Sequence, residues 1–422
     1  MFAIVIPVGG KGSRVSKLTN GNSKTEIEIL KNKKIIDFQI EQVSKLNKKI
    51  IILSNAKFKL LNNYLTKRYN NLNIDIIEEN KQLGTAGCLA ILKKYKYKFF
   101  LVVNGDLIFN INIYKLFKFH IEKKSECTLV VHPNNHPNDS DCLELKDNFQ
   151  IKKFYFKPHK NKNIPNLCLA GINILNKKVL NFITKDKFQD FSKNFLKKNL
   201  KKINFFGYNT REYIKDAGTP KRINQVKKDI FTIKYIKGNL NKKIPAIFLD
   251  KDGVINKLDK KKHYQKINIL SGVIRAIKII NKSGYLSILI TNQPAIAKGV
   301  ISESKFQMDI KKLSYYLSKN NCYLDRIYFC PHHPEKGFKG EVKKYKIKCN
   351  CRKPNNGLLL KAIDDLNIDK KNSYMIGDQF TDYLASKKTN IKFIGVNNNL
   401  LRKKNIGLYK NNFLKAVKYI LN

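Results

Sequence analysis

Two aspartates separated by one residue stand near the middle of the chain, directly after an apolar stretch. They are Asp250 and Asp252, in FLDKDGVIN. When two carboxylates lie this close, one can attack a phosphorus atom while the other handles the proton of the leaving group. Thr291 ends the next apolar stretch, Lys353 precedes a predicted helix, and Asp378 ends a later apolar stretch. These residue types in this order indicate phosphoryl-group chemistry.

A glycine-rich loop at the start of the chain is a second candidate site. The segment PVGGKGSR follows an apolar stretch and carries three glycines and two cations. Glycine lets backbone N–H groups approach phosphate oxygens, and the cations match their charge. The spacing fits neither the dinucleotide-binding fingerprint nor the P-loop. On this segment alone, a tight turn without a ligand remains an alternative.

Both candidate sites need strands and helices to position them, and the first half of the chain supplies one series. Apolar strands are predicted at 2–8, 49–54 and 99–106, with helices between them at 35–46 and 85–95. Strands that alternate with helices predict a parallel sheet covered by helices on both faces. From about residue 126 the pattern becomes strand-rich, and a helix at 220–230 closes the unit.

A second series follows a polar segment at 231–243, which we interpret as a linker. After the strand that leads to Asp250, further strands are predicted at 286–293, 326–332, 373–378 and 392–397, with helices at 272–284 and 357–368 between them. We therefore expect an α/β protein with two domains, at 1–232 and 244–422.

Five motifs of the first half occur in an order that resembles the sugar-nucleotide pyrophosphorylases, over about residues 1–230. They are the GGKGSR loop, Lys24 in NSKTEIEI, QLGTAG at 82–87, NGD at 104–106 and KDAGTP at 215–220. The resemblance implies a Rossmann-like nucleotidyltransferase domain with a mixed sheet. In such a domain a sugar 1-phosphate oxygen attacks the α-phosphorus of an NTP and expels pyrophosphate, which requires positioning and charge neutralisation.

The resemblance assigns phosphate and metal contacts. Asp106 and Asp216 would hold Mg²⁺ against the α-phosphate. Lys11 and Arg14 would neutralise the departing pyrophosphate, and Lys24 the reacting phosphates. The glycines that present backbone N–H groups to these phosphates would be Gly9, Gly10 and Gly12.

The resemblance also assigns contacts to the base and the sugar. Gly84 and Thr85 would contact the base, and Asn173, in AGINIL, would lie near the sugar. Two positions depart from the family pattern. Ser23 stands where a proline is usual, and Phe156 stands where the family has a glutamate that contacts the sugar.

Residues 244–398 resemble the haloacid-dehalogenase phosphatases, which implies a parallel α/β domain. The resemblance makes Asp250 the nucleophile that forms an aspartyl-phosphate, and Asp252 the general acid and then the base that activates water. Thr291 and Lys353 would bind the transferring phosphoryl group. Asp378, with Asp250 and the backbone carbonyl of Asp252, would hold Mg²⁺.

Three segments match one branch of these phosphatases more closely. TNQPAIAKG, CPHHP and CNCRKP resemble the D,D-heptose 1,7-bisphosphate phosphatases and their histidinol-phosphatase relatives. By this resemblance four further residues would bind substrate: Asn256, Asn292, Gln293 and Arg352. Pro294 replaces the usual serine after TNQ, and Gln379 replaces the usual lysine after GD.

Three of the eight cysteines cluster with a histidine in the same region. Cys330, His332, Cys349 and Cys351 form the pattern C-x-H…C-x-C. Three thiolates and one imidazole saturate a tetrahedral ion, which predicts a closed, structural Zn²⁺ site that pins the loop carrying Arg352 and Lys353. His333 competes as a ligand, and the spacing in the family favours His332. The other cysteines are interpreted as ordinary core or surface residues: Cys88, Cys127, Cys142, Cys168 and Cys322.

Basic residues greatly outnumber acidic ones, 83 against 32, for a net charge of +51. Only eight of the 83 are arginine, and the lysines are spread from end to end. Specific nucleic-acid readers concentrate charge on one face and rely on arginine. We therefore expect no nucleic-acid partner, although a basic nucleic-acid-binding protein stays as the non-enzymatic alternative.

The expected location is the cytoplasm. No apolar run approaches the ~20 residues of a membrane span, and the first residues turn into a glycine-rich loop where a signal peptide would continue apolar. Sparse cysteines that cluster with a histidine fit metal binding in a reducing compartment.

Joined in one chain, the two resemblances imply consecutive reactions. A heptose 1,7-bisphosphate would lose its 7-phosphate, and the resulting heptose 1-phosphate would receive a nucleotidyl group for surface-polysaccharide synthesis. The heptose-activating members of the first family imply GTP and the α-anomer. The enzymatic alternative is another sugar nucleotidyltransferase joined to a phosphatase of unrelated specificity, including a histidinol-phosphatase type.

Overall fold

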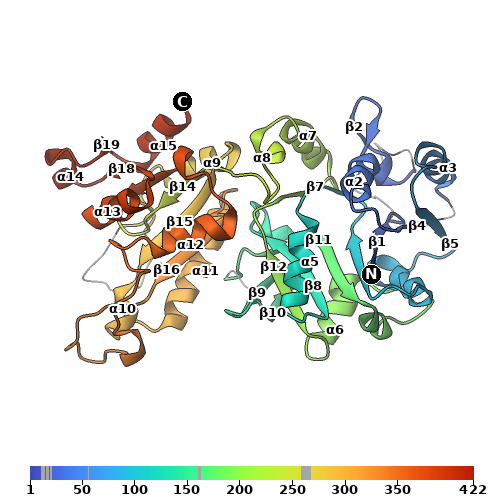
Figure 1. Ribbon diagram of the computed structural model, residues 1–422, viewed down its shortest axis with the longest axis horizontal. Coiled ribbons are helices and arrows are strands. Elements are labelled where there is room, and N and C mark those ends of the chain that lie inside the picture. Colours follow the sequence, from blue (N-terminus) through green and yellow to red (C-terminus); the bar gives the residue numbers. More distant parts are fainter. Residues whose placement is uncertain (11–14, 16–18, 20, 56, 160–162, 258–267) are drawn as a thin grey trace. The chain divides into compact units, whose positions relative to one another are not determined.

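The structure is a computed structural model (Figure 1), and it describes residues 1–10, 15, 19, 21–55, 57–159, 163–257 and 268–422. Lys11, Gly12 and Arg14 of the glycine-rich loop lie outside the described residues. The chain divides into two compact units: one comprises Met1–His132, Ser140–Pro158 and Leu167–Asn239, and the other Pro133–Asp139, His159–Asn166 and Leu240–Asn422. Among the described residues, each helix is too short or too polar to cross a membrane.

A nine-stranded sheet runs through the first unit in the order β10-β9-β11-β6-β1-β4-β5, with β8 joined to β11 and β12 to β8. Its strands are β1 (Phe2–Pro7), β4 (Ile50–Asn55), β5 (Ile74–Glu79), β6 (Phe99–Val103), β8 (Cys127–His132), β9 (Cys142–Leu145), β10 (Ile151–Tyr155), β11 (Cys168–Asn176) and β12 (Phe205–Asn209). β1 pairs in parallel with β4 and β6, and β4 with β5, whereas β11 is antiparallel to β6. The predicted mixed sheet is confirmed.

The helices of the first unit partly differ from expectation. They are α2 (Ile35–Ser44), α3 (Lys59–Arg68), α4 (Gly84–Gly87), α5 (Ile113–Glu122), α6 (Lys197–Asn199), α7 (Pro220–Asp229) and α8 (Ile233–Ile236). The 3₁₀ helices η2 (Lys24–Glu26), η3 (Cys88–Lys94) and η5 (Lys177–Phe182) and the π-helix η6 (Phe191–Leu196) also belong to this unit, whereas the 3₁₀ turn η4 (Pro137–Asp139) belongs to the second. The helical stretch predicted at 85–95 is present in two parts, because the α-helical turn ends at Gly87 and the chain continues as the 3₁₀ helix η3. The predicted linker also contains a helical turn, α8.

A small antiparallel sheet, absent from the sequence-based expectation, links two distant segments of the first unit. It pairs β7 (Leu107–Asn110) with β13 (Tyr213–Asp216), so that Asp216 stands opposite Leu107. A second pair joins β2 (Glu28–Leu30) to β3 (Lys33–Lys34). Side chains from α2, α7 and the β7–β13 pair share one apolar core. This packing places residues just after β6 next to residues more than 100 positions later.

The second unit contains a fully parallel six-stranded sheet in the order β16-β15-β14-β17-β18-β19. Its strands are β14 (Ala246–Leu249), β15 (Leu286–Asn292), β16 (Arg326–Cys330), β17 (Tyr374–Gly377), β18 (Lys392–Val396) and β19 (Leu408–Lys410). The chain moves outward from β14 to β16 and then returns to β17 on the other side. Such a reversal opens a crevice at the carboxyl ends of the strands.

Helices cover both faces of this sheet (Figure 1). They are α9 (Val273–Lys282), α10 (Pro294–Ala297), α11 (Glu303–Lys319), α12 (Gly357–Leu366), α13 (Phe380–Thr389), α14 (Asn399–Lys403) and α15 (Phe413–Leu421), with the 3₁₀ turns η7 (Lys343–Tyr345) and η8 (Lys370–Asn372). Side chains alternate along β14: Ile247 and Leu249 pack with α9, α11 and α15, whereas Ala246 and Phe248 pack with α12 and α13. Both faces are therefore buried, which explains the continuous apolar sequence of this strand. The predicted parallel α/β fold is confirmed.

Candidate active sites and metal centre

A buried lysine holds two carboxylates at the carboxyl edge of the second sheet. Asp250 directly follows β14, and its Oδ1 accepts a hydrogen bond of 2.6 Å from Lys353 Nζ. The same ammonium lies 2.6 Å from Oδ1 of Asp382 and donates to the carbonyl of Ile290. The side chains of Lys353 and Asp382 are 3% and 1% exposed, so this ion pair is shielded from water.

Burial shifts the pKa values of these groups. It raises the pKa of Asp250 to about 7, although Lys353 lowers it, and the negative charges of Asp382 and Asp252 add to the rise. For Lys353 burial lowers the pKa, but the two carboxylates outweigh it and the pKa is raised. Burial likewise raises the pKa of Asp378 to about 6. The site therefore holds more negative charge than one ammonium group can balance.

Three carboxylates converge at this point in a way that fits a cation. Asp250, Asp378 and Asp382 each offer an oxygen, and these oxygens lie within 4.8 Å of one another. Oδ1 of Asp378 is buried and has no hydrogen-bond partner among the described residues. Carboxylate oxygens arranged in this way usually bind a hard divalent cation. Gly253 has φ of +86° and lies against the Asp378 carboxylate, so a side chain at 253 would both strain the backbone and fill this space.

The second aspartate of the pair is held by amide groups. Asp252 Oδ1 accepts a hydrogen bond of 2.8 Å from Asn256 Nδ2 and another from its neighbour Lys251. Gln293 Nε2 donates to Oδ2 of Asp252 at 3.3 Å and to Thr291 Oγ1 at 2.9 Å. The structure thus brings Asp252, Asn256, Gln293 and Thr291 into one network beside Asp250.

Asn292 contacts the backbone that carries the lysine. Its Nδ2 donates to the carbonyl of Lys353 at 2.9 Å, and its Oδ1 accepts from the N–H of Lys353 at 3.0 Å. These two hydrogen bonds fix the position of the lysine from 61 residues away. The structure therefore gives Asn292 a positioning contact, and the substrate contact expected for it stays a prediction.

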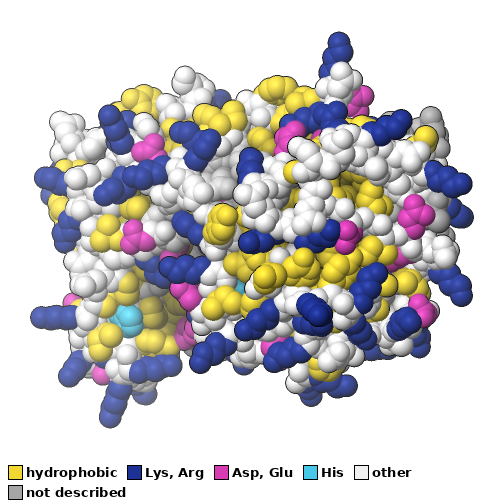
Figure 2. Space-filling view, turned by 45° about the vertical axis from the view of Figure 1, so that its right-hand side comes forward, with side chains coloured by type: hydrophobic (Ala, Val, Ile, Leu, Met, Phe, Trp, Pro, Cys, Tyr) yellow, Lys and Arg dark blue, Asp and Glu magenta, His cyan; other side chains and the backbone are white. Residues whose placement is uncertain are grey.

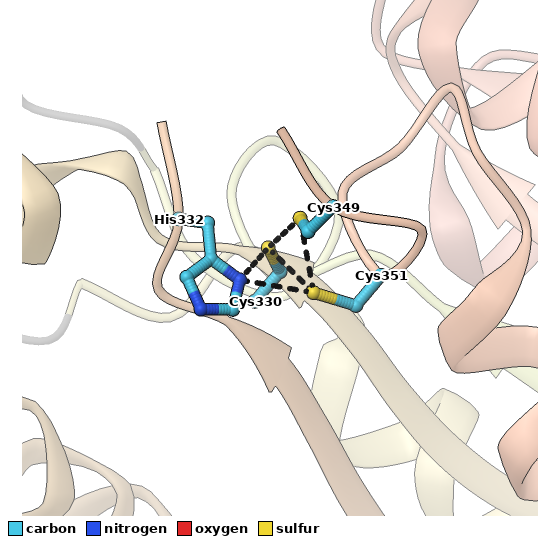
Figure 3. Close-up of side chains that lie close together, drawn as sticks. All are labelled: Cys330, His332, Cys349 and Cys351. Carbon is cyan, nitrogen blue, oxygen red and sulfur yellow. Dashed lines mark hydrogen bonds between the residues drawn. The ribbon is translucent and has the colours of Figure 1, made fainter. Parts of the chain in front are cut away.

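The four predicted zinc ligands lie together in a compact group (Figure 3). The Sγ atom of Cys351 lies 3.1 Å from that of Cys330, 3.2 Å from that of Cys349 and 3.2 Å from His332 Nδ1. Around an ion with Zn–S bonds of about 2.3 Å, tetrahedral ligand atoms are about 3.8 Å apart. The donor set and its close spacing fit one tetrahedral, thiophilic ion.

The neighbouring histidine lies outside this group. His333 is 7% exposed, and its Nε2 lies 3.7 Å from Glu335. Arg352 follows the last cysteine and donates a hydrogen bond of 3.4 Å to the carbonyl of His332. This hydrogen bond joins the loop that carries His332 to the segment that carries Lys353. The remaining five cysteines are buried.

In the first unit a short ion pair joins two predicted site residues. Lys24 Nζ lies 2.5 Å from Asp106 Oδ2, with side chains 23% and 16% exposed. The Cε atom of Lys24 lies 3.6 Å from the position that a Cβ would take on Gly10. The structure therefore brings together the described part of the glycine loop, the lysine and the first aspartate.

Ser23 explains how Lys24 is placed. It caps the turn η2, and its buried hydroxyl donates a hydrogen bond of 3.0 Å to the carbonyl of Val8, just before the glycine loop. Gly105 also permits close packing, since a Cβ there would lie 2.6 Å from the carbonyl of Pro7. The serine that departs from the family pattern thus ties the lysine to the end of β1.

Asp216 reaches the same region through the β7–β13 pair. The N–H of Ala217 donates to the carbonyl of Asp106 at 2.8 Å. The carboxylate of Asp216 accepts a hydrogen bond of 2.7 Å from Arg222 in α7. A backbone hydrogen bond therefore joins the segments that carry Asp106 and Asp216, the two aspartates predicted to share Mg²⁺. The carboxylate of each is paired with a cationic side chain.

Gly84 and Thr85, the residues predicted to contact the base, lie against another segment of the protein. Gly84 has φ of +75°, and a Cβ there would lie 2.7 Å from the carbonyl of Gln189. Thr85 Oγ1 accepts from the N–H of Phe191 at 2.8 Å and lies 3.3 Å from Asp190. These contacts dock the 189–191 segment on α4, and a contact of Gly84 or Thr85 with a base stays a prediction.

The two residues expected near the sugar differ in their surroundings. Asn173 is buried on β11, opposite Val102 of β6. Phe156 stacks on Phe154, with ring centroids 5.5 Å apart, and packs against the apolar core. The side chain of Phe156 therefore contributes to the packing of the apolar core.

Sequence reasoning missed Asp382, although it ends the segment GDQFTD at 377–382, which begins just before Asp378. Asp378 alone was assigned because it directly follows the strand. The second carboxylate, Asp382, lies in the first turn of α13, and it reaches the site because α13 begins at Phe380. The spacing of two acids across a helix start was the signal that could have found it.

Both units thus place acidic and basic side chains beyond the ends of parallel strands, as proteins that transfer phosphate groups do. The chain belongs to the nucleotidyl transferase family, whose model matches residues 3–232, and also to the family of the D-glycero-beta-D-manno-heptose-1,7-bisphosphate 7-phosphatases. A HAD-hydrolase-like model matches residues 350–412.

Two 7-phosphatases and one solved structure are similar to parts of this chain. The 7-phosphatase of Salmonella typhi is 38% identical over 151 residues, which are 36% of this chain and 78% of that protein. The 7-phosphatase of Haemophilus ducreyi is 42% identical over 150 residues, 35% of this chain and 79% of that protein. Among solved structures, HddC from Yersinia pseudotuberculosis is 24% identical, covers 55% of this chain and all of its own, and has a TM-score of 0.47.

Proposed function

We propose that this bifunctional chain first removes the 7-phosphate from D-glycero-D-manno-heptose 1,7-bisphosphate and then transfers a nucleotidyl group from GTP to the heptose 1-phosphate. The phosphatase and nucleotidyltransferase activities follow from the two families. The choice of GTP and of the α-anomer is our inference, as are the bounds 1–232 and 244–422 for the two activities. The product would be an activated heptose for surface polysaccharide.

The observation that carries the phosphatase assignment is the buried Lys353 between Asp250 and Asp382. In the first step an oxygen of Asp250 bonds to phosphorus, the bond from phosphorus to the sugar oxygen breaks, and Asp252 gives that oxygen a proton. In the second step Asp252 takes a proton from water, whose oxygen bonds to phosphorus and displaces Asp250. Lys353 and Thr291 would hold the phosphoryl oxygens throughout.

Metal ions would support both activities. Asp250 and Asp378 would hold Mg²⁺, which lowers the repulsion between the phosphate and the carboxylates. Cys330, His332, Cys349 and Cys351 would hold Zn²⁺, which fixes the loop and keeps Arg352 near the substrate phosphates. Gln293 and Asn256 would orient Asp252.

For nucleotidyl transfer, Lys24 and Asp106 carry the proposal. The sugar phosphate oxygen is already a nucleophile, so this step needs no proton transfer: its bond to the α-phosphorus forms as the bond to pyrophosphate breaks. Lys24 would neutralise the reacting phosphates, while Asp106 and Asp216 would hold Mg²⁺. The glycine loop would bind the triphosphate.

Two expectations about partners and location complete the proposal. Lysine and arginine side chains are scattered across the face shown in Figure 2 and do not form a single stripe. This scatter supports small phosphorylated substrates over nucleic acid as the partner. The free thiols of the metal cluster suit the reducing cytoplasm.

The test is incubation with Mg²⁺, each anomer of the heptose 1,7-bisphosphate, and GTP, ATP, CTP or UTP in turn. We expect release of phosphate and pyrophosphate and a GDP-heptose by mass spectrometry, for GTP with the α-anomer. Phosphate release without a nucleotide sugar, for all four nucleotides and both anomers, would reject the heptose assignment of the first unit. Histidinol phosphate, as a parallel substrate, tests the alternative phosphatase.

A further inference from the structure

Glu79 is the last residue of β5, and one oxygen of its carboxylate accepts no hydrogen bond from the described residues. Oε1 is buried and without a partner among the described residues. Its neighbour Glu78 behaves ordinarily, since it is exposed and accepts a hydrogen bond from Asn62 Nδ2. The difference between the two glutamates lies in the direction that each faces from the strand.

The carboxylate of Glu79 faces the candidate nucleotide site. Oε2 lies 3.9 Å from the position that a Cβ would take on Gly9, at the start of the glycine loop. On another side it is close enough to Cys88, which directly follows α4, to raise the pKa of that thiol further. Glu79 therefore lies next to both the proposed triphosphate loop and the turn at 84–87.

A buried carboxylate oxygen without a hydrogen-bond partner is energetically costly. Burial raises the pKa of Glu79 to about 7. The chain contains 83 lysines and arginines, and none of those described donates a hydrogen bond to Oε1 of Glu79. A buried oxygen without a partner calls for an explanation, and a ligand with N–H donors supplies one.

The four nucleobases differ in the hydrogen-bond donors and acceptors that they present to a carboxylate. An ionised carboxylate only accepts hydrogen bonds, and it does so through two adjacent oxygens. Guanine alone presents two adjacent donors, N1–H and the 2-amino group, on its Watson–Crick edge. Adenine and cytosine place a ring-nitrogen acceptor beside their amino group, and uracil flanks its single N–H with two carbonyl oxygens.

We propose that Glu79 reads the base of the nucleotide by accepting hydrogen bonds from N1–H and the 2-amino group of guanine. This inference rests on the proposed nucleotidyl transfer and names the residue that makes it specific for GTP. With any other base an acceptor would face the carboxylate, and that mismatch would reject the nucleotide more strongly than lost contact area could.

The test measures binding to the full-length protein with Mg²⁺ by calorimetry, using GTP, UTP and inosine 5′-triphosphate, which differs from GTP only by lacking the 2-amino group. We expect the wild type to bind GTP about 10- to 100-fold more tightly than inosine triphosphate, as for a hydrogen bond to a charged group. In Glu79→Gln, which offers one donor and one acceptor, this ratio should shrink to about threefold or less, and the ratio of GTP to UTP affinity should fall. The matched control Glu78→Gln should keep both wild-type ratios.

The outcomes separate the two proposals. If the wild type binds none of the nucleotides, nucleotidyl transfer itself is rejected and base reading falls with it. If it binds GTP and Glu79→Gln keeps the preference over inosine triphosphate, only the base reading is overturned. An equal loss of affinity for all three nucleotides would also overturn it, because that would show a merely structural role.

Discussion

The ammonium group of Lys353 lies 2.6 Å from Oδ1 of Asp382, and both side chains are almost completely buried. The lysine also hydrogen bonds to the proposed nucleophile Asp250. Asp382 therefore helps to decide where the lysine stands when phosphate binds. This relationship adds the carboxylate in α13 to the proposed phosphatase site even though it need not touch the substrate.

We predict that Asp382→Asn lowers kcat/KM for phosphate release by at least about 100-fold. Without the charge of Asp382, Lys353 is paired with the carboxylate of Asp250 alone among the described residues, and a displacement of about 1 Å of a group that positions the substrate can cost about 100-fold. Nucleotidyl transfer from a supplied sugar 1-phosphate should persist. Asp364→Asn, an exposed change in α12, is the control, and equal activity of the two variants would contradict the prediction.

The two activities should separate by single substitutions. Asp250→Asn removes the nucleophile, so phosphate release should fall by at least about 1,000-fold while nucleotidyl transfer stays. Asp106→Asn should do the reverse, because it removes the partner of Lys24. Both reactions are assayed on variants whose circular dichroism matches the wild type. Loss of both activities in either folded variant would argue against two independent sites.

We predict one zinc ion per chain that survives dialysis against EDTA, because closed tetrahedral sites exchange slowly. Cys349→Ser should lose this zinc and lower the melting temperature, since the loop would lose its anchor. Elemental analysis and thermal unfolding measure the two effects. Cys322→Ser, a buried cysteine outside the cluster, should keep its zinc. Wild-type protein without zinc would refute the closed metal site.

Affinity for GTP should depend on the ionisation of Glu79. Its pKa of about 7 means that the carboxyl group is neutral below pH 7 and ionised above it. Only the ionised form accepts both guanine hydrogen bonds, so GTP affinity should fall as pH decreases below 7, approaching about tenfold per unit. Burial raises the pKa of the adjacent Cys88 thiol, which stays neutral over this range.

The control for this pH effect is Glu79→Gln, because the triphosphate itself titrates in the same range. Calorimetry between pH 5.5 and 8.5 should show a weaker pH dependence for the variant than for the wild type. Identical profiles would mean that Glu79 does not titrate against the base.

The sequence by itself determined the two α/β series, the order of the motifs and the chemical types of the site residues. Asp250, Thr291 and Asp378 could be placed because each directly follows an apolar strand, and parallel strands bring their carboxyl ends to one edge. The cluster of Cys330, His332, Cys349 and Cys351 could be predicted because three thiols and one imidazole, in a C-x-H pair and a C-x-C pair, suffice to complete a tetrahedron. Such features follow from residue type and from the position of each residue at a strand end or in a short motif.

Only the tertiary structure decided what the remaining residues touch. Asn292 holds the backbone of Lys353, 61 residues away, and Thr85 accepts from the N–H of Phe191, 106 residues away. Asp216 meets the region of Asp106 through a two-stranded sheet that neither segment predicts alone. The unpartnered oxygen of Glu79 likewise becomes visible only once its surroundings are known. A short polar side chain can satisfy a ligand or the protein's own backbone equally well, and long-range packing chooses between them.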